Sequence, residues 1–178
     1  MRLNTLLAKA VRTENDKSLR EHQIKTIVEI LGCDQVWFRE NTQGTSPYKS
    51  QLGFEQIARG DPLLNFMKDK YDIKLNTFGD YGLLHQDSSY LKIEEVLNKV
   101  DPWVLLSLFV ISQSTKSTIV ALALLNEFIS LEDAILVSRL EEIYQQKFFG
   151  VVAGAHDYDE ARTISDVSSA KWFINLLQ

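Results

Sequence analysis

The sequence predicts a mainly α-helical fold: a compact bundle of about seven helices with a small two-stranded β element. Apolar residues recur at helical spacing through most of the 178 residues. Only 8 Gly and 3 Pro are present, which disfavours loop-rich all-β folds. The most apolar stretch, residues 103–129, is interrupted by a polar run, which is typical of two core helices or one long buried helix. We expect residues 1–178 to form a single helical domain.

The first two predicted helices have clear signals. Apolar residues within 3–10 repeat at helical spacing, beside three basic and no acidic residues in the first thirteen. This segment is either the ordinary first helix of the domain, which we favour, or an import presequence. A second helix is expected to begin at Ser18, which forms a capping box with Glu21, and to end at Gly32.

The β element and the next helix come from short local patterns. Residues 36–39 and 73–78 are rich in β-forming side chains, and we expect them to pair as two strands. Residues 41–50 contain Gly, Thr, Ser and Pro and are predicted to be a loop. Asp61 before Pro62 predicts a helix start, because a capping acid precedes a proline at the first helical position.

The second half of the chain is predicted to be almost entirely helical. Asp101 before Pro102 repeats the start signal, and Ser130 with Asp133 predicts another cap. The two central segments are apolar nearly all round, as expected for helices inside a bundle. The expected helices of this half lie within residues 88–97, 104–111, 114–128, 130–149 and 157–177.

Composition and motifs exclude several classes of function. A net charge of −5 argues against a broad nucleic-acid-binding surface. The single cysteine, Cys33, rules out an internal disulfide and a multi-cysteine zinc site. Neither half of the 103–129 stretch reaches the roughly 20 apolar residues of a membrane-spanning helix. With no P-loop, Rossmann glycine motif, nucleophile elbow or zinc-protease motif, we expect no catalytic residue, cofactor or metal.

One pair of residues keeps an enzyme open as an alternative. His156 precedes Asp157, but a catalytic dyad requires geometry rather than adjacency in sequence. Asp157 fits better as the N-cap of the final helix. A small-molecule enzyme that uses His156 would need a pocket around that side chain.

The C-terminal region carries the charge of the whole chain. Residues 131–160 contain seven acidic and two basic side chains, so a partner chosen by charge or a solvated acidic helix face would both fit. On a helix, Glu142 has polar neighbours, whereas Glu141 borders Val137 and Tyr144. A carboxylate at that border is either paired on folding or exposed beside apolar surface, and the second arrangement suits a binding face.

Several segments resemble one chaperone family. Val-Ser-Arg-Leu-Glu-Glu-Ile-Tyr-Gln at 137–145, Phe-Gly at 149–150 and Ala-His-Asp-Tyr at 155–158 resemble the C-terminal region of the ATP synthase F(1)-sector assembly factors that bind the α subunit. Upstream segments, including 33–39, agree in order, so the resemblance covers nearly the whole chain. From the resemblance, we expect the family's usual β-rich N-terminal domain to be absent from this chain. Phe149 replaces a usual Trp, and Ala153 and Gly154 replace a usual Glu and Trp.

The resemblance implies an assembly chaperone, not an enzyme. Such a protein binds the unassembled α subunit of ATP synthase and prevents its aggregation until the β subunit displaces it. It implies the mitochondrial matrix as the location, although the chain shows no clear presequence. The partner-binding residues implied are Glu141 first, followed by Arg139, Tyr144 and Asp157. The alternative is a generic helical protein-interaction adaptor with no catalytic activity.

Overall fold

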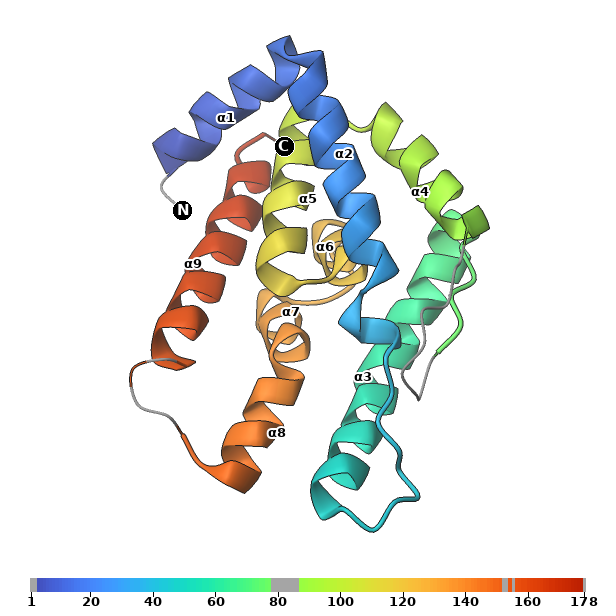
Figure 1. Cartoon of the computed structure of the whole chain (residues 1–178). Coiled ribbons are helices and arrows are strands. Elements are labelled where there is room, and N and C mark those ends of the chain that lie inside the picture. The colour runs from blue at the N-terminus through green and yellow to red at the C-terminus, as the bar shows by residue number, and fades with distance from the viewer. Residues whose placement is uncertain (1–2, 78–86, 152–153, 155, 178) are drawn as a thin grey trace.

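Helix α5 (Pro102–Thr115) lies at the centre of the computed structural model (Figure 1). The structure describes residues 3–77, 87–151, 154 and 156–177, without the side chains of residues 87–89 and 156. The other elements are α1 (Leu3–Asn15), α2 (Lys17–Gly32), the 3-10 helix η1 (Gln35–Trp37), α3 (Pro47–Tyr71), α4 (Asp87–Lys99), α6 (Thr118–Leu125), α7 (Leu131–Ser138), α8 (Leu140–Phe149) and α9 (His156–Asn175). Helix α5 packs against α1, α2, α6, α7 and α9, so both halves of the chain share one core.

The apolar stretch in the middle of the chain forms two helices, α5 and α6. As expected, the Asp101 side chain caps α5, accepting a hydrogen bond of 2.8 Å from the backbone N–H of Trp103. Lys116 adopts a left-handed conformation (φ 53°) that ends α5, and Ser117 then caps α6. Nearly every residue of α6 is buried, which explains its uniformly apolar sequence. None of the described helices is long and apolar enough to cross a membrane.

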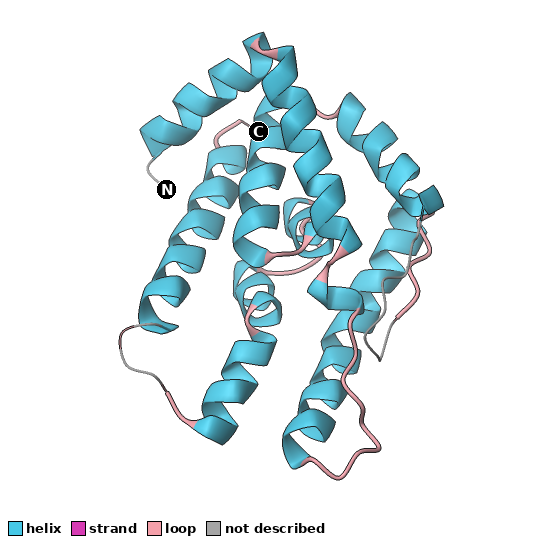
Figure 2. Ribbon diagram, in the orientation of Figure 1, coloured by secondary structure: helices cyan, strands magenta, loops and turns pink. Residues whose placement is uncertain are grey.

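The predicted two-stranded β element is wrong. No strand occurs among the residues that the structure describes (Figure 2), and Phe38 makes only an isolated bridge. The cause is local: the Asp34 carboxylate accepts a hydrogen bond of 3.1 Å from the N–H of Val36 and turns the chain into η1. Residues 73–77 are extended without forming a strand, and residue 78 of the predicted strand lies outside the described residues.

Helix α3 begins much earlier than expected. Its N-cap is Ser46, inside the predicted loop, and the helix continues through Pro62, which was predicted to start it. Proline removes one backbone hydrogen bond from a helix interior, but burial of apolar side chains on both sides of Pro62 keeps α3 continuous. Asp61 is therefore no cap; its carboxylate forms an ion pair of 2.7 Å with Arg39.

The described residues contain nine α-helices, more than the expected seven or so. One reason is that the helix predicted across 130–149 divides at Arg139 into α7 and α8. The predicted Ser130 cap of α7 is confirmed, since its side chain accepts a hydrogen bond of 3.0 Å from the N–H of Asp133. The last helix already begins at His156, so Asp157 lies in its first turn and is not its N-cap.

The N-terminal segment is part of the folded domain. Leu6 and Ala10 of α1 are fully buried, and α1 packs on α2, α5 and α9. This confirms the interpretation of residues 3–10 as an ordinary first helix. Helix α2 begins one residue before the expected Ser18, because Asp16 caps it by accepting a hydrogen bond of 3.1 Å from the N–H of Leu19.

Two glycines let the chain after η1 cross closely over α3. A Cβ added to Gly53 would lie 2.6 Å from the carbonyl oxygen of Glu40, and one added to Gly60 would lie 2.9 Å from that of Val36. Both contacts involve backbone atoms, which cannot rotate away as a flexible side chain can.

We expect Gly53→Ala to lower the free energy of unfolding by about 1–2 kcal/mol, because overpacking outweighs the gain in helix propensity. Urea unfolding measures the change. Gly44→Ala is the control, since its added Cβ would meet no atom closer than 3.7 Å. A Gly53→Ala protein as stable as the parent would contradict the close crossing.

The buried Asp34 carboxyl joins η1 to the start of α6. Besides Val36, it accepts a hydrogen bond of 3.0 Å from the N–H of Ile119. Loss of solvation raises its pKa from 3.8 to about 6, although hydrogen bonds from Ile119, Ser117 and Val36 oppose the shift. The folded protein therefore holds this proton more tightly than the unfolded chain does. The stability from this group is full below pH 3.8 and is lost as the pH rises through about 6.

The pH dependence of Asp34 can be isolated by comparison with Asp34→Asn, whose side chain does not ionise. Between about pH 4.5 and about pH 7.5, the wild-type protein should lose about 2 kcal/mol of unfolding free energy relative to this variant. Urea unfolding of both proteins at constant ionic strength measures the difference. Parallel pH profiles for the two proteins would show that Asp34 does not titrate in this range.

Candidate partner-binding surface

A groove with a volume of about 760 Å³ opens between three parts of the molecule. One wall is η1 with its flanking residues, the second is the middle of α3, and the third is the junction of α7 and α8. We call it the α3–α8 groove. Its apolar lining consists of Val36, Trp37, Phe38, Val137 and Leu140, and its polar lining includes Asp34, Gln35, Arg39, Glu40, Gln56, Arg59 and Glu141.

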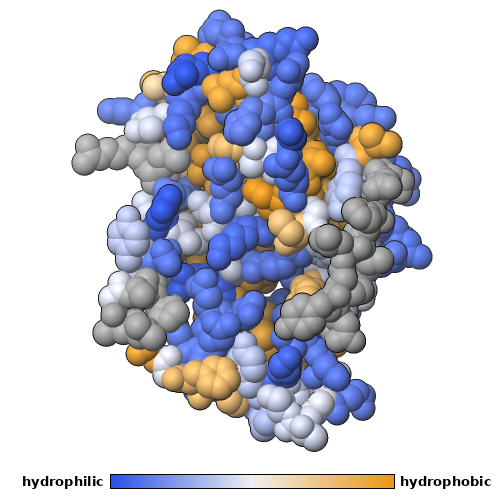
Figure 3. All heavy atoms as spheres, viewed as in Figure 1, coloured by the Kyte–Doolittle hydropathy of each residue, from blue (hydrophilic) through white to orange (hydrophobic). Residues whose placement is uncertain are grey.

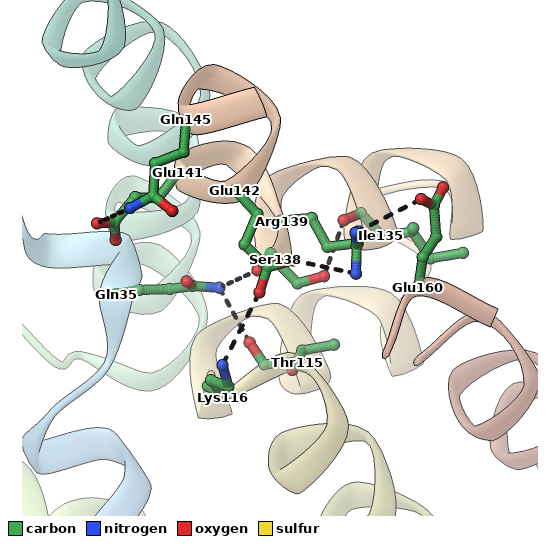
Figure 4. Close-up of polar contacts among 10 residues, drawn as sticks. All are labelled: Gln35, Thr115, Lys116, Ile135, Ser138, Arg139, Glu141, Glu142, Gln145 and Glu160. Carbon is green, nitrogen blue, oxygen red and sulfur yellow. Dashed lines mark hydrogen bonds and ion pairs between the residues drawn. The ribbon is translucent and has the colours of Figure 1, made fainter. Parts of the chain in front are cut away.

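Glu141 lies in the first turn of α8 and lines this groove. Its side chain is exposed, and one carboxylate oxygen accepts a hydrogen bond of 3.1 Å from Nε2 of Gln145 (Figure 4). Within the described part of the chain, no Lys, Arg or His lies at ion-pair distance from it. Of the two arrangements that the sequence left open, the structure has the exposed carboxylate beside apolar surface.

Tyr144 lies one turn further along α8 and faces α3. Burial raises the pKa of its hydroxyl, the charge of Glu55 raises it further, and Arg59 lowers it. Both charged residues belong to α3, so the Tyr144 hydroxyl lies on the side of α8 that faces α3. The ammonium group of Lys147 lies 5.0 Å from the centre of the Tyr144 ring.

Aromatic side chains join the tips of α3 and α8. The Tyr48 ring, in the first turn of α3, makes edge contacts with Phe148 and Phe149, at centroid distances of 5.6 and 5.2 Å. Burial and the charge of Glu141 raise the pKa of Tyr48, while a hydrogen bond with Gln145 lowers it. Glu141, Gln145 and Tyr48 therefore form one connected polar group across the two helices.

Arg139 is buried at the α7–α8 junction, with its side chain 5% exposed. Its guanidinium forms ion pairs of 3.0 Å with Glu142 and 3.5 Å with Glu160 of α9 (Figure 4). These contacts fix the start of α8, and with it the position of Glu141. Binding of a partner by Arg139 stays a prediction, and the structure gives this side chain internal partners.

The side-chain amide of Gln35 attaches the groove wall to the ends of two core helices. Nε2 of Gln35 donates hydrogen bonds to the carbonyl oxygens of Thr115, at 2.9 Å, and Ser138, at 3.0 Å (Figure 4). These carbonyls lie in the last turns of α5 and α7, whose final carbonyl groups lack helical partners. Gln35 thus connects η1 to both helices.

Asp157 lies apart from the groove, in the first turn of α9, with an exposed side chain. It precedes Glu160 by three residues, so the two acids are neighbours on one helix face, and Glu160 reaches Arg139. The structure thus places Glu141 and Tyr144 together on α8, whereas Asp157 lies on α9, three residues before the Glu160 that pairs with Arg139.

Large apolar side chains are exposed near the free end of α8. Phe149 is 74% exposed, and Val151 is 63% exposed. Hydrophobic residues are visible on the surface at the lower end of the molecule, below α8 (Figure 3). Exposed apolar surface of this kind commonly marks a site of protein contact.

The groove itself could not be predicted from the sequence. Phe38 and Trp37 were assigned to a strand, and the helix that supplies Gln56 and Arg59 was predicted to begin only at Pro62. The glycines at positions 53 and 60, seven residues apart, were the available signal for a helix face crossed closely by another segment.

The described residues add no support for the alternative of a small-molecule enzyme that uses His156. The side chain of His156 lies outside the described residues, and so does all of His85. Across the described ranges, no three His, Cys, Asp or Glu side chains are grouped so that they could hold a metal ion.

In the part of the chain that the structure describes, the fold is a helical bundle with an open groove lined by apolar and charged side chains, and it matches the fold of solved bacterial proteins. Atp12 from Paracoccus denitrificans superimposes with a TM-score of 0.83 at 20% identity, over 97% of this chain and 72% of that protein. A single-substitution variant of P. denitrificans Atp12p gives a TM-score of 0.84 with the same identity and coverage. Atu1473 from Agrobacterium tumefaciens, described as a candidate chaperone, gives 0.79 at 22% identity, over 99% of this chain and 65% of that one.

These comparisons confirm, at the level of the fold, the resemblance to ATP synthase F(1) assembly factors that the sequence indicated. No protein-family model matches the sequence. Two of the three similar structures are of bacterial Atp12, and the third is a bacterial protein described as a candidate chaperone.

Proposed function

We propose that this protein is an assembly chaperone that binds the unassembled α subunit of the ATP synthase catalytic sector and keeps it from aggregating before α/β assembly. The fold, which is that of Atp12, supports this proposal. The observation that carries it is the exposed carboxylate of Glu141, which has no ionic partner among the described residues and lies on the edge of a groove with an apolar lining.

The chemistry of the surface suits reversible binding of an apolar client. An unassembled subunit exposes apolar area that it later buries, and such area promotes aggregation. A groove that combines apolar side chains with charged edges can cover part of this area without forming an obligate interface. Glu141 and Tyr144 are the proposed contact residues on α8, Asp157 extends the acidic surface onto α9, and Arg139 holds α8 in position.

The proposed action requires no catalysis, cofactor or nucleic acid. The α subunit is the proposed client, and the mitochondrial matrix is the proposed location, both by resemblance to the assembly-factor family. The competing proposal is a generic helical adaptor with another protein partner, which the exposed aromatic side chains near α8 also fit.

Co-expression with the α subunit tests the proposal. The α subunit should co-purify with this chain, and its aggregation, followed by light scattering, should decrease as the chain is added. If the α subunit neither co-purifies nor stays soluble, the proposed client is wrong. Affinity capture from a whole mitochondrial lysate tests the adaptor alternative, because an adaptor would retain a different protein in preference to the α subunit.

A further inference from the structure

We propose that the α3–α8 groove binds an extended client segment in which an apolar side chain lies next to a single basic side chain. The apolar side chain would lie against Phe38 and Leu140, and the basic one would pair with Glu141. This inference rests on the proposed function and specifies which part of a client is recognised. The charges and the apolar lining of the groove define the kind of client segment that would bind there.

The charges of the groove are almost all neutralised within the protein. Three of the charged side chains that line the groove form ion pairs. These pairs are Arg39 with Asp61 at 2.7 Å, Glu40 with Lys49 at 3.4 Å, and Arg59 with Glu55 at 2.9 Å. Asp34 is buried and accepts backbone hydrogen bonds.

Glu141 is therefore the exposed charged residue of the groove that has no ionic partner in the described part of the chain, whereas the Asp34 carboxyl is buried. A single negative charge at the edge of the groove is complemented by a single positive charge on the client. A client segment with several basic side chains would find no further free acid among the described lining residues, and an acidic segment would be repelled.

The lining also defines the kind of side chain that fits. Phe38 is 37% exposed, whereas Trp37, Val137 and Leu140 are at least nine-tenths buried and present only part of their surface. The groove is thus a largely preformed apolar surface rather than a set of free side chains. Preformed apolar sites reduce the entropy lost on binding, which favours one inserted aliphatic or aromatic side chain as the anchor.

The glycines of α3 maintain this space. Because Gly60 lacks a Cβ, Arg39 and the carbonyl of Val36 pack directly on the α3 backbone, and the chain carrying Phe38 follows closely. Phe38 is thereby held at the groove by close backbone packing, so its removal should change the groove with little effect on the core.

Binding of overlapping short peptides from the α subunit to the full chain tests the inference. Peptides with an apolar residue next to one Lys or Arg should bind, and replacement of that basic residue by Gln should weaken binding about tenfold. The native Cys33, which is exposed and lines the groove, reports occupancy, because a bound peptide should slow its reaction with a thiol reagent such as DTNB.

Two matched variants locate the binding site. Phe38→Ala should weaken binding of the peptide about fivefold or more. Phe54→Ala removes a more exposed ring of the same type from α3, outside the groove lining, and should change binding less than about twofold. The thermal midpoint of each variant shows whether it is folded. On Glu141→Lys, a peptide with Glu in place of its basic residue should bind better than the original peptide.

The outcomes separate this inference from the proposed function. If the α subunit binds but Phe38→Ala and Phe54→Ala weaken binding equally, or bound peptide leaves the reactivity of Cys33 unchanged, the groove is not the binding site and the inference is overturned. If the peptide with Glu in place of its basic residue does not bind Glu141→Lys better than the original peptide does, the proposed pairing of the basic residue with Glu141 is overturned. If the α subunit itself does not bind, the proposed function fails first.

Discussion

Replacement of Glu141 by lysine is expected to weaken association with the α subunit by at least about tenfold while the thermal midpoint changes little. Glu141 is exposed and has a glutamine as its hydrogen-bond donor, so the folded protein gains little stability from its charge. A positive charge at this edge of the groove would instead repel a basic client side chain. Titration calorimetry or surface immobilisation measures the affinity, and a melting curve measures the midpoint.

Glu95→Lys is the matched control for this experiment. Glu95 is exposed in the middle of α4, which packs on α2 and does not line the groove, and the substitution makes the same change in net charge. The control should bind the α subunit as the wild-type protein does. Equal losses for the two variants would mean that the total charge, not the position of Glu141, governs binding. A large drop in the midpoint of Glu141→Lys would assign a structural role to this carboxylate.

Replacement of Arg139 by methionine is expected to lower the free energy of unfolding by about 3 kcal/mol. Methionine fills much of the same volume, but it leaves the half-buried Glu142 carboxylate without its guanidinium partner. The ion pair with Glu160 is lost as well, and the start of α8 loses its attachment to α9. Urea unfolding followed by circular dichroism measures the change.

A surface ion pair provides the comparison for Arg139. Arg162→Met breaks the contact of the exposed Arg162 side chain with Asp166, at 3.9 Å, and should cost less than about 1 kcal/mol. Adding Glu142→Leu to Arg139→Met should recover part of the lost stability, because it removes the stranded charge. If Arg139→Met cost no more than Arg162→Met, the buried guanidinium would not be holding the α7–α8 junction.

The elements that the sequence predicted correctly are those with local causes. Asp101 and Ser130 cap helices because each side chain bonds to a backbone N–H two or three residues further along. The apolar α5 and α6 are buried as their composition required. Local helical spacing placed Glu141 at the border of an apolar stripe but left open whether its carboxylate is paired or exposed, and the structure shows it exposed.

The elements that were missed depend on contacts between distant segments. Asp61 followed by Pro62 is typical of a helix start, but tertiary packing keeps α3 continuous through these residues. Val36 and Trp37 have the composition of a strand, but they are buried in a 3-10 turn set by Asp34, whose carboxylate reaches Ile119 across the fold. The groove arises from the approach of η1, α3 and α8, and no sequence window contains all three. The internal role of Arg139 was missed for the same reason, since Glu160 lies on another helix.

The hydrogen bonds of Gln35 couple the shape of the proposed binding groove to the packing of the helix bundle, and this coupling limits which substitutions the protein can tolerate. One amide holds a wall of the groove to the ends of two helices, so any substitution that loosens those ends also alters the geometry offered to a ligand. Variants selected for heat resistance at α5 or α7 should consequently show altered ligand selectivity, even where the replaced residue lies far from the groove opening.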